Sequence, residues 1–221
     1  HDIVRDFTLA SQVPSALQSL QISFVQTVVN TIDMSTHGKS SKVIIEYSHK
    51  MLASHIRGAV SSPLHQHKWF LKCLLHTDTA VVDQVFQGVD VEEVSDLAEW
   101  LSSDAGGNDF LNAAKVYSKA SEVVRNSTKA EKCEHMRRAV DKADKVPAGP
   151  DRTEALRISY MKRCHITMFG DSKKEIDECL DWLFAFLNIE DNVKQLSEHD
   201  VTRAKFITGS TYLGQVHTVY F

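Results

Sequence analysis

The sequence predicts an all-α protein in which two packed helical bundles are joined by a short linker. Apolar residues recur every three or four positions through most of the chain, and clusters of Gly, Pro and Ser separate these stretches. Residues that favour strands gather only in the C-terminal tail. The chain has 221 residues, 43% of them apolar and 24% charged, which is enough to bury a core in each of two units.

The first two helices are expected at 14–32 and 40–60, on either side of a loop around Gly38. Apolar side chains at helical spacing define both stretches. They are Leu17, Leu20, Phe24, Val25, Val28, Val29 and Ile32 in the first, and Val43, Ile44, Tyr47, Met51, Leu52 and Ile56 in the second.

A Ser-Ser-Pro sequence at 61–63 is expected to end the second helix and to start a third, which holds Trp69. Serine caps helices and proline suits a first helical turn. A fourth helix at 79–86 stops at Gly88, a residue type common just beyond helix ends. Gly88 is therefore the expected limit of the first bundle.

Five more helices are expected in the second half of the chain. Their ranges are 91–101, 108–125, 129–145, 151–169 and 172–187. Asp151 is an expected N-cap, and Ser172 with Glu175 has the spacing of a capping box. The helix at 129–145 is mostly charged and has few large apolar residues, so it is expected at the surface as a contact face.

The expected domains are an N-terminal bundle at 1–88, a middle bundle at 89–187, and a C-terminal helix and arm at 188–221. From Lys205 to Phe221 the tail is rich in Thr, Val, Ile, Tyr and Phe, which predicts a short β-like arm. No apolar run reaches the ~18 residues that span a bilayer, and the N-terminus lacks a signal-peptide pattern. Membrane contact is therefore expected to be peripheral.

The net charge of −4 conceals an asymmetry. Residues 1–114 carry −6, residues 115–174 carry +7, and residues 175–221 carry −5. A basic middle between acidic ends predicts contact with a polyanion or docking between subunits, while a solvated helical surface is the alternative. The expected polyanion-binding residues, for lipid or RNA, are Lys115, Lys119, Arg125, Lys129, Lys132, Arg137, Arg138, Lys142 and Lys145. Glu131, Glu134, Asp141 and Asp144 offer these cations ion pairs instead.

Catalytic motifs for phosphate loops, dinucleotide binding, zinc proteases and serine hydrolases are absent, so no catalytic residue, cofactor or small-molecule substrate is expected. Cys73, Cys133, Cys164 and Cys179 form no CxxC pair, and their spacing to histidines fits no structural zinc pattern. Reduced thiols and no bound metal are expected.

Eleven histidines are an unusual number for a chain of this length. The unperturbed histidine pKa is about 6.5, so their protonation would add positive charge in the pH range of an endosome. The expected pH sensors are those of the first bundle, His49, His55, His65, His67 and His76. Partial unfolding by acid is the alternative.

Four motifs follow one another between residues 13 and 187. They are Val13-Pro14-Ser15-Ala16-Leu17; Ser62-Pro63-Leu64; a Gly-Gly turn before Asn108 with Asn112-Ala113-Ala114-Lys115-Val116-Tyr117-Ser118-Lys119; and Phe169-Gly170 followed by Glu175-Ile176. In order and interval they resemble the orthomyxovirus matrix proteins, with the thogotovirus branch closest. Influenza members carry a basic run where this chain has Lys119-Ala120-Ser121-Glu122, and a Cys/His cluster where it has Cys179 alone, so nuclear targeting and zinc are not implied.

The resemblance implies a viral matrix protein that self-assembles beneath the envelope and bridges anionic phospholipid and the viral ribonucleoprotein or its RNA. It implies the virion, the host cytoplasm and the plasma membrane as locations, with the nucleus as a further candidate. Two alternatives stay open. One is a cellular helical-repeat adaptor, although no 34-residue period is present; the other is a negative-strand RNA virus nucleoprotein, which should be more basic.

Overall fold

The computed structural model describes residues 14–35, 42–60, 63–76, 79–123 and 128–189, and in the C-terminal segment residues 194, 196–198, 200–202, 205–206 and 209. All regular structure within these residues is helical, which confirms the all-α class. The expected β-like arm lies largely outside the described residues. The helices in chain order are α2 (Pro14–Ser35), α3 (Lys42–Ala59), η1 (Leu64–Gln66), α4 (Lys68–Leu74), α5 (Thr79–Gly88), α6 (Val91–Leu101), η2 (Asp104–Gly106), α7 (Phe110–Val123), α8 (Lys129–Asp144), α9 (Arg152–Phe169) and α10 (Lys173–Leu187).

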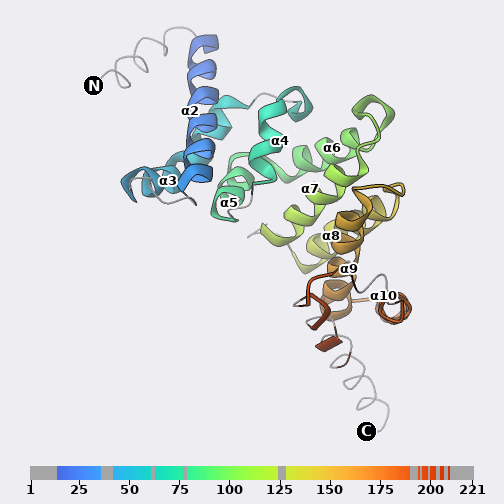
Figure 1. Cartoon of the computed structure of the whole chain (residues 1–221). Helices are drawn as coiled ribbons and strands as arrows, with labels where there is room; N and C mark the ends of the chain where they lie inside the picture. The colour runs from blue at the N-terminus through green and yellow to red at the C-terminus, as the bar shows by residue number, and fades with distance from the viewer. Residues whose placement is uncertain are drawn as a thin grey trace. The chain divides into compact units, whose positions relative to one another are not determined.

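Every stretch that was expected to be helical overlaps a helix of the structure (Figure 1). The chain forms two compact units, residues 1–97 and 98–221, and the division falls inside α6 rather than at Gly88. The expected domain limits at 88 and 187 stay predictions.

In the first unit α3 packs against both α2 and α5, and α4 packs on α5. The buried core draws on each of these helices, with Val25, Leu52, Phe70 and Val81 fully enclosed. Gln18 of α2 donates a hydrogen bond of 3.1 Å to the carbonyl oxygen of Ala59 at the end of α3. This bond satisfies a carbonyl that the helix itself leaves without an intrahelical partner.

In the second unit α8 lies against α7 on one side and α9 on the other. Its buried face carries small residues, among them Cys133, Ala139 and Ala143, and α7, which packs against it, also has small buried residues such as Ala113 and Ala120. The expectation that 129–145 forms a surface helix is confirmed for one face only, because Lys129, Glu131, Glu134, Asp141 and Asp144 are exposed while the opposite face is buried. Small side chains let helices approach closely, so α8 can pack tightly although it lacks large apolar residues.

The start of α8 is fixed by a full capping box at Thr128. The Thr128 hydroxyl accepts a hydrogen bond from the backbone N–H of Glu131, and the Glu131 carboxylate accepts one from the backbone N–H of Thr128. At α10 the expected cap is present in part, since Ser172 accepts from the N–H of Glu175. Asp151 makes no side-chain cap to α9, so that expectation is wrong.

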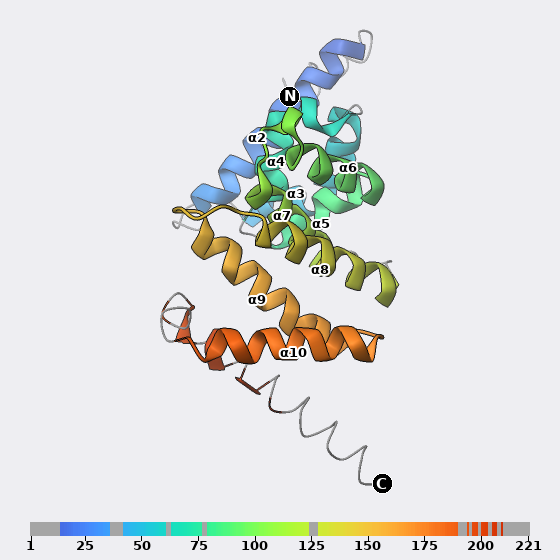
Figure 2. The same cartoon turned by 90° about the vertical axis from the view of Figure 1, so that its right-hand side faces the viewer.

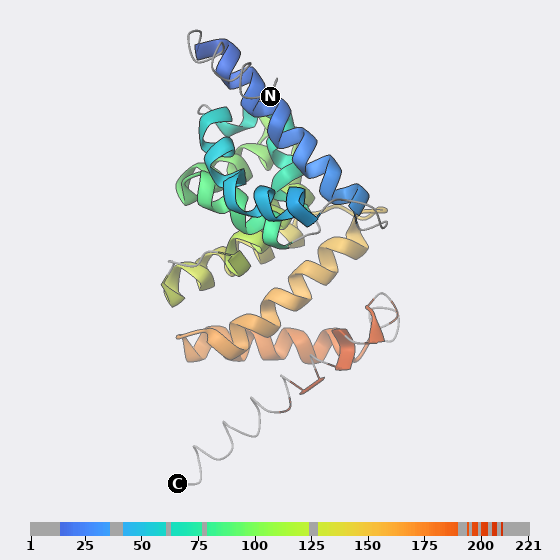
Figure 3. The same cartoon turned by 90° about the vertical axis from the view of Figure 1, so that its left-hand side faces the viewer.

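Helices α9 and α10 form a V whose apex is the turn at 170–172 (Figures 2 and 3). Between them lies a cluster that includes Tyr160, Leu183 and Phe186. Leu196 and Val201 of the C-terminal segment pack on the same cluster. The described part of this segment is therefore attached to the second unit.

Gly88 provides a test of the packing in the first unit. A Cβ atom added there would lie 2.8 Å from Cγ2 of Ile56 and 2.9 Å from the carbonyl oxygen of Ala53, so α3 and α5 approach closely at this glycine. We expect Gly88→Ala to lower the free energy of unfolding by roughly 1–3 kcal/mol through overpacking. Urea denaturation followed by circular dichroism measures this, with Gly107→Ala as a control that meets no neighbouring atom but is strained at its φ of 82°. A Gly88→Ala protein as stable as the wild type would contradict the close approach.

Candidate functional site

Five of the nine expected polyanion-binding residues lie within ion-pair distance of a carboxylate in the second unit. The pairs are Lys129 with Asp171, Arg137 with Glu134 and Glu175, Arg138 with Glu134, Lys142 with Glu99, and Lys145 with Asp141. From the sequence, ion pairs with Glu134 and Asp141 were the alternative to a free polyanion-binding face on this helix, and both carboxylates form such pairs in the structure. Most of its positive charge is therefore matched by carboxylates of the same chain.

Arg137 ties α8 to α10. Its guanidinium donates two hydrogen bonds to the Glu175 carboxylate, one of them 2.7 Å long between Nη2 and Oε2. A third, longer contact of 3.5 Å reaches Glu134 on α8 itself. The hydrogen bonds to Glu175 hold the pKa of Arg137 above its ordinary value, so the arginine keeps its charge throughout. A fork-shaped pair of this kind fixes orientation as well as distance.

Lys142 does not belong to an exposed face, because it is buried and its ammonium group contacts the Glu99 carboxylate at 2.7 Å. The other oxygen of Glu99 accepts a hydrogen bond of 2.7 Å from the Tyr117 hydroxyl. Tyr117 in turn accepts one of 3.3 Å from Arg138. Partial burial opposes the ionisation of Glu99, but the hydrogen bonds from Lys142 and Tyr117 outweigh it and lower the pKa of Glu99.

A second buried lysine, Lys162 of α9, was not singled out from the sequence. Its ammonium group donates to the Glu122 carboxylate at 2.6 Å and to the Ser118 carbonyl oxygen at 3.1 Å, both on α7. Lys162 is 1% exposed. A lysine so deeply buried stays charged only when it is paired and hydrogen-bonded, so this contact locks α9 to the end of α7.

Three of the expected cations stay available for a ligand. Lys115, Lys119 and Lys132 are half-exposed, and no carboxylate within the described residues lies at ion-pair distance from them. Lys115 and Lys119 are four residues apart on α7, on the side away from its buried residues Ala113, Tyr117 and Ala120. Arg125 lies outside the described residues. The basic face that the structure presents is thus smaller than the sequence suggested.

The expected pH sensors fall into two environments. His55 and His76 are buried, whereas His65 and His67 are half-exposed beside η1. The ring of His55 packs 4.0 Å from that of Phe24, measured between centroids, and burial lowers the pKa of His55. The side chain of His49 lies outside the described residues.

His135 of α8 was missed by the sequence analysis, because nothing in a charged helix marks one histidine as buried. It is 8% exposed and stacks on the Tyr117 ring, and its Nδ1 has no hydrogen-bond partner among the residues that the structure describes. Burial, with a smaller contribution from the charge of Arg138, lowers the pKa of His135. The imidazole is therefore held in its neutral form within the core.

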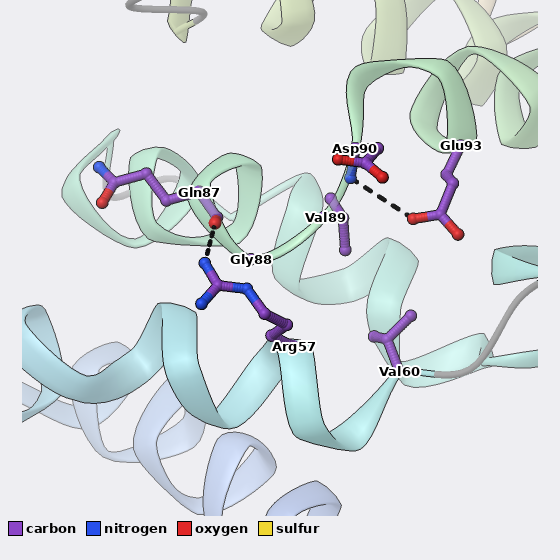
Figure 4. A pocket seen from close by; sticks show the side chains of 7 residues that line it. All are labelled: Arg57, Val60, Gln87, Gly88, Val89, Asp90 and Glu93. Carbon is purple, nitrogen blue, oxygen red and sulfur yellow. Dashed lines mark hydrogen bonds between the residues drawn. The ribbon is translucent and has the colours of Figure 1, made fainter.

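The first unit has a surface pocket of about 240 Å³ where α5 ends and α6 begins. Figure 4 shows Arg57 of α3 reaching the Gln87 carbonyl oxygen, a hydrogen bond of 2.9 Å, with Asp90 and Glu93 on the far side of Val89. The backbone N–H of Asp90 donates to Glu93 at 3.4 Å. One cation and two carboxylates give this pocket no single sign of charge, and Arg57 already uses one donor on the backbone.

Within the described residues no group of three or more His, Cys, Asp or Glu side chains is arranged to hold a metal ion. The four cysteines are buried thiols that form no disulfide, and burial raises the pKa of Cys179 to about 11. Among the described helices none combines the length and the apolar character required to cross a bilayer.

The fold and these sites define an all-α protein with two compact units and an internally paired basic helix. Neither a family model, nor a curated protein, nor a solved structure matches the chain.

The Arg137 contact predicts how α8 responds to charge reversal. Arg137→Glu removes the tie to α10 and places a third carboxylate beside Glu134 and Glu175. We expect the free energy of unfolding to fall by roughly 1–3 kcal/mol. Lys145→Glu, which faces only the half-exposed Asp141, is the matched control and should cost less than about 1 kcal/mol. Adding Glu175→Arg to Arg137→Glu should restore part of the loss in urea denaturation; equal losses in the two single variants would contradict the structural role of Arg137.

His135 predicts a dependence of stability on pH. Because its pKa in the folded protein is lowered, the unfolded chain binds more protons, and stability should fall as the pH drops below about 6.5. Replacing His135 by Phe, which keeps a ring against Tyr117, should make the urea midpoint fall less steeply between pH 7.5 and 5.5. His55→Phe should act in the same direction in the first unit. Midpoints that decline in parallel with the wild type would show that neither histidine controls the acid response.

Proposed function

We propose that this chain is a matrix-type scaffold protein of an enveloped virus, which associates with itself and with anionic phospholipid beneath the envelope and contacts the ribonucleoprotein. The observation that carries the proposal is the position of the four resemblance motifs. Pro14 is the first residue of α2, and Pro63 directly precedes Leu64, the first residue of η1. Phe169-Gly170 ends α9.

The turn before α7 supports the same proposal. Gly107 and Asn108 both have left-handed backbone conformations, with φ of 82° and 56°. Gly and Asn are the residue types that tolerate this conformation best, so the Gly-Asn pair has a physical reason to stand there. The motifs therefore stand where their residue types have a structural role, and the resemblance itself rests on their order and interval.

Lys115 and Lys119 are the residues that this function would use first. They lie on one face of α7 and are not neutralised by a described carboxylate. A lysine close to an anionic leaflet contributes about 1 kcal/mol, so a layer of many copies would bind where one copy binds weakly. Contact through surface charge requires no membrane-spanning helix.

Vesicle pelleting tests the proposal. The wild type should pellet with phosphatidylserine vesicles and not with phosphatidylcholine vesicles at about 0.1 M salt, and about 0.5 M salt should release it. Lys115→Glu with Lys119→Glu should weaken binding by roughly tenfold or more. Lys173→Glu with Lys174→Glu makes the same change of charge on exposed residues of α10 and is the matched control.

Equal loss in the two double variants would mean that net charge alone, and not the α7 face, governs binding. Binding to RNA in a gel shift without binding to vesicles would favour the nucleoprotein alternative. If the protein binds neither vesicles nor RNA and sediments as a monomer, the result would favour the helical-repeat adaptor alternative.

A further inference from the structure

A cavity of about 430 Å³ lies between α7, α8 and α9 in the second unit. This volume falls within the range of about 300–1,000 Å³ that small-molecule sites occupy. Its apolar wall includes Cys133 and Met136, both buried, and Phe169 at the end of α9. The Cys133 thiol contacts the Phe169 carbonyl oxygen at 3.4 Å, and burial raises its pKa, so the sulfur contributes a neutral surface.

Three charged side chains also line the cavity: Lys129, Lys132 and Glu122. Glu122 is neutralised by the buried Lys162 at 2.6 Å. Lys129 is paired with Asp171, although both are well exposed to water. Lys132 has no carboxylate at ion-pair distance within the described residues. The uncompensated charge of the cavity is therefore positive.

We propose that this cavity binds an amphipathic anion, that is, a molecule with an apolar body carrying one carboxylate or phosphate. The apolar body lies against Met136 and Phe169, and the anionic group meets Lys132. A neutral apolar molecule would leave the Lys132 charge unused, and a small inorganic anion would leave the apolar wall in contact with water. The pairing of an apolar wall with one free cation selects a ligand that has both parts.

This site is separate from the α7 face. Neither Lys115 nor Lys119 lines the cavity. The inference therefore does not rest on the proposed membrane function, and either can fail without the other.

Three probe molecules test the contributions of the apolar body and of the anionic group separately. Octanoate has both parts, octan-1-ol has only the apolar body, and acetate has only the anion. Binding is followed in the full chain by NMR of methyl-labelled methionine, because Met136 lines the cavity and Met51 belongs to the first unit. Octanoate should shift the Met136 signal to saturation and leave Met51 unmoved, octan-1-ol should bind about tenfold more weakly, and acetate should produce no shift.

The decisive variants are Lys132→Glu and Lys115→Glu, two half-exposed lysines with the same change of charge. Lys132→Glu should weaken the binding of octanoate by at least about tenfold without weakening the binding of octan-1-ol. Lys115→Glu should leave the affinity for both probes unchanged. Lys132→Ala is the second variant, which loses the cation without adding a carboxylate. The signal of Met161, which packs on the Tyr160 cluster of the second unit and does not line the cavity, reports whether that unit is folded in each variant. Equal effects of the two reversals, saturable octan-1-ol binding as tight as octanoate, or an unmoved Met136 signal would each overturn the proposal.

A competition experiment identifies the source of the anion. If saturating octanoate displaces the wild type from phosphatidylserine vesicles, the cavity takes a membrane lipid. If octanoate fills the cavity and pelleting is unchanged, the ligand is a free amphiphile. Both results require the Met136 shift, so both support the site.

Discussion

The placement of the charged helix α8 between α7 and α9 is the constraint on which the second unit depends. A helix in this position turns some cations towards its neighbours, and a buried charge is tolerated only when it is paired. The buried Lys142 therefore meets Glu99 of α6, and the half-exposed Arg137 adds a second pair with Glu175 of α10. These pairs are geometrically specific in a way that apolar contacts are not. Small residues such as Ala139 bring the helices close, and the ion pairs set which turns face each other.

The same pairing determines what the surface can do. The excess of +7 in residues 115–174 suggested a broad basic face. Many of these positive charges are paired with carboxylates within the second unit, and even the buried Lys162 pairs with Glu122. Among the described residues of this window, five cations have no carboxylate at ion-pair distance: Lys115 and Lys119 on the outer side of α7, Lys132 at the cavity, Arg152, which donates to backbone carbonyls, and Lys173 at the start of α10. A few free cations in defined places favour selective contacts with one headgroup or one ligand over the extended track that a nucleic acid backbone requires.

The sequence predicted the helices well because each is bounded by a local signal, such as the proline at Pro14 or the Phe169-Gly170 step. It did not predict the buried face of α8, because burial there depends on Ala139, Ala143 and Cys133, small residues that carry little hydrophobic signal. The candidate site was predicted only in part. Glu99 and Lys142 are 43 residues apart, and no periodicity links residues at such a separation. Which cations stay free could be decided only after their partners were in place.

Acid acts on this chain through residues in two different environments, and the difference bears on how a layer of subunits would come apart. His55 and His135 are buried and neutral, so their protonation works against the folded state of each unit. Of the five histidines expected as sensors, only His65 and His67 are half-exposed among those the structure describes. A switch that works only by adding charge between folded subunits would therefore have few accessible histidines to protonate. In the proposed layer, acid would act on packing within the units, because protonating His135 would place a cation against Tyr117 and close to Arg138, within the network that orders α8.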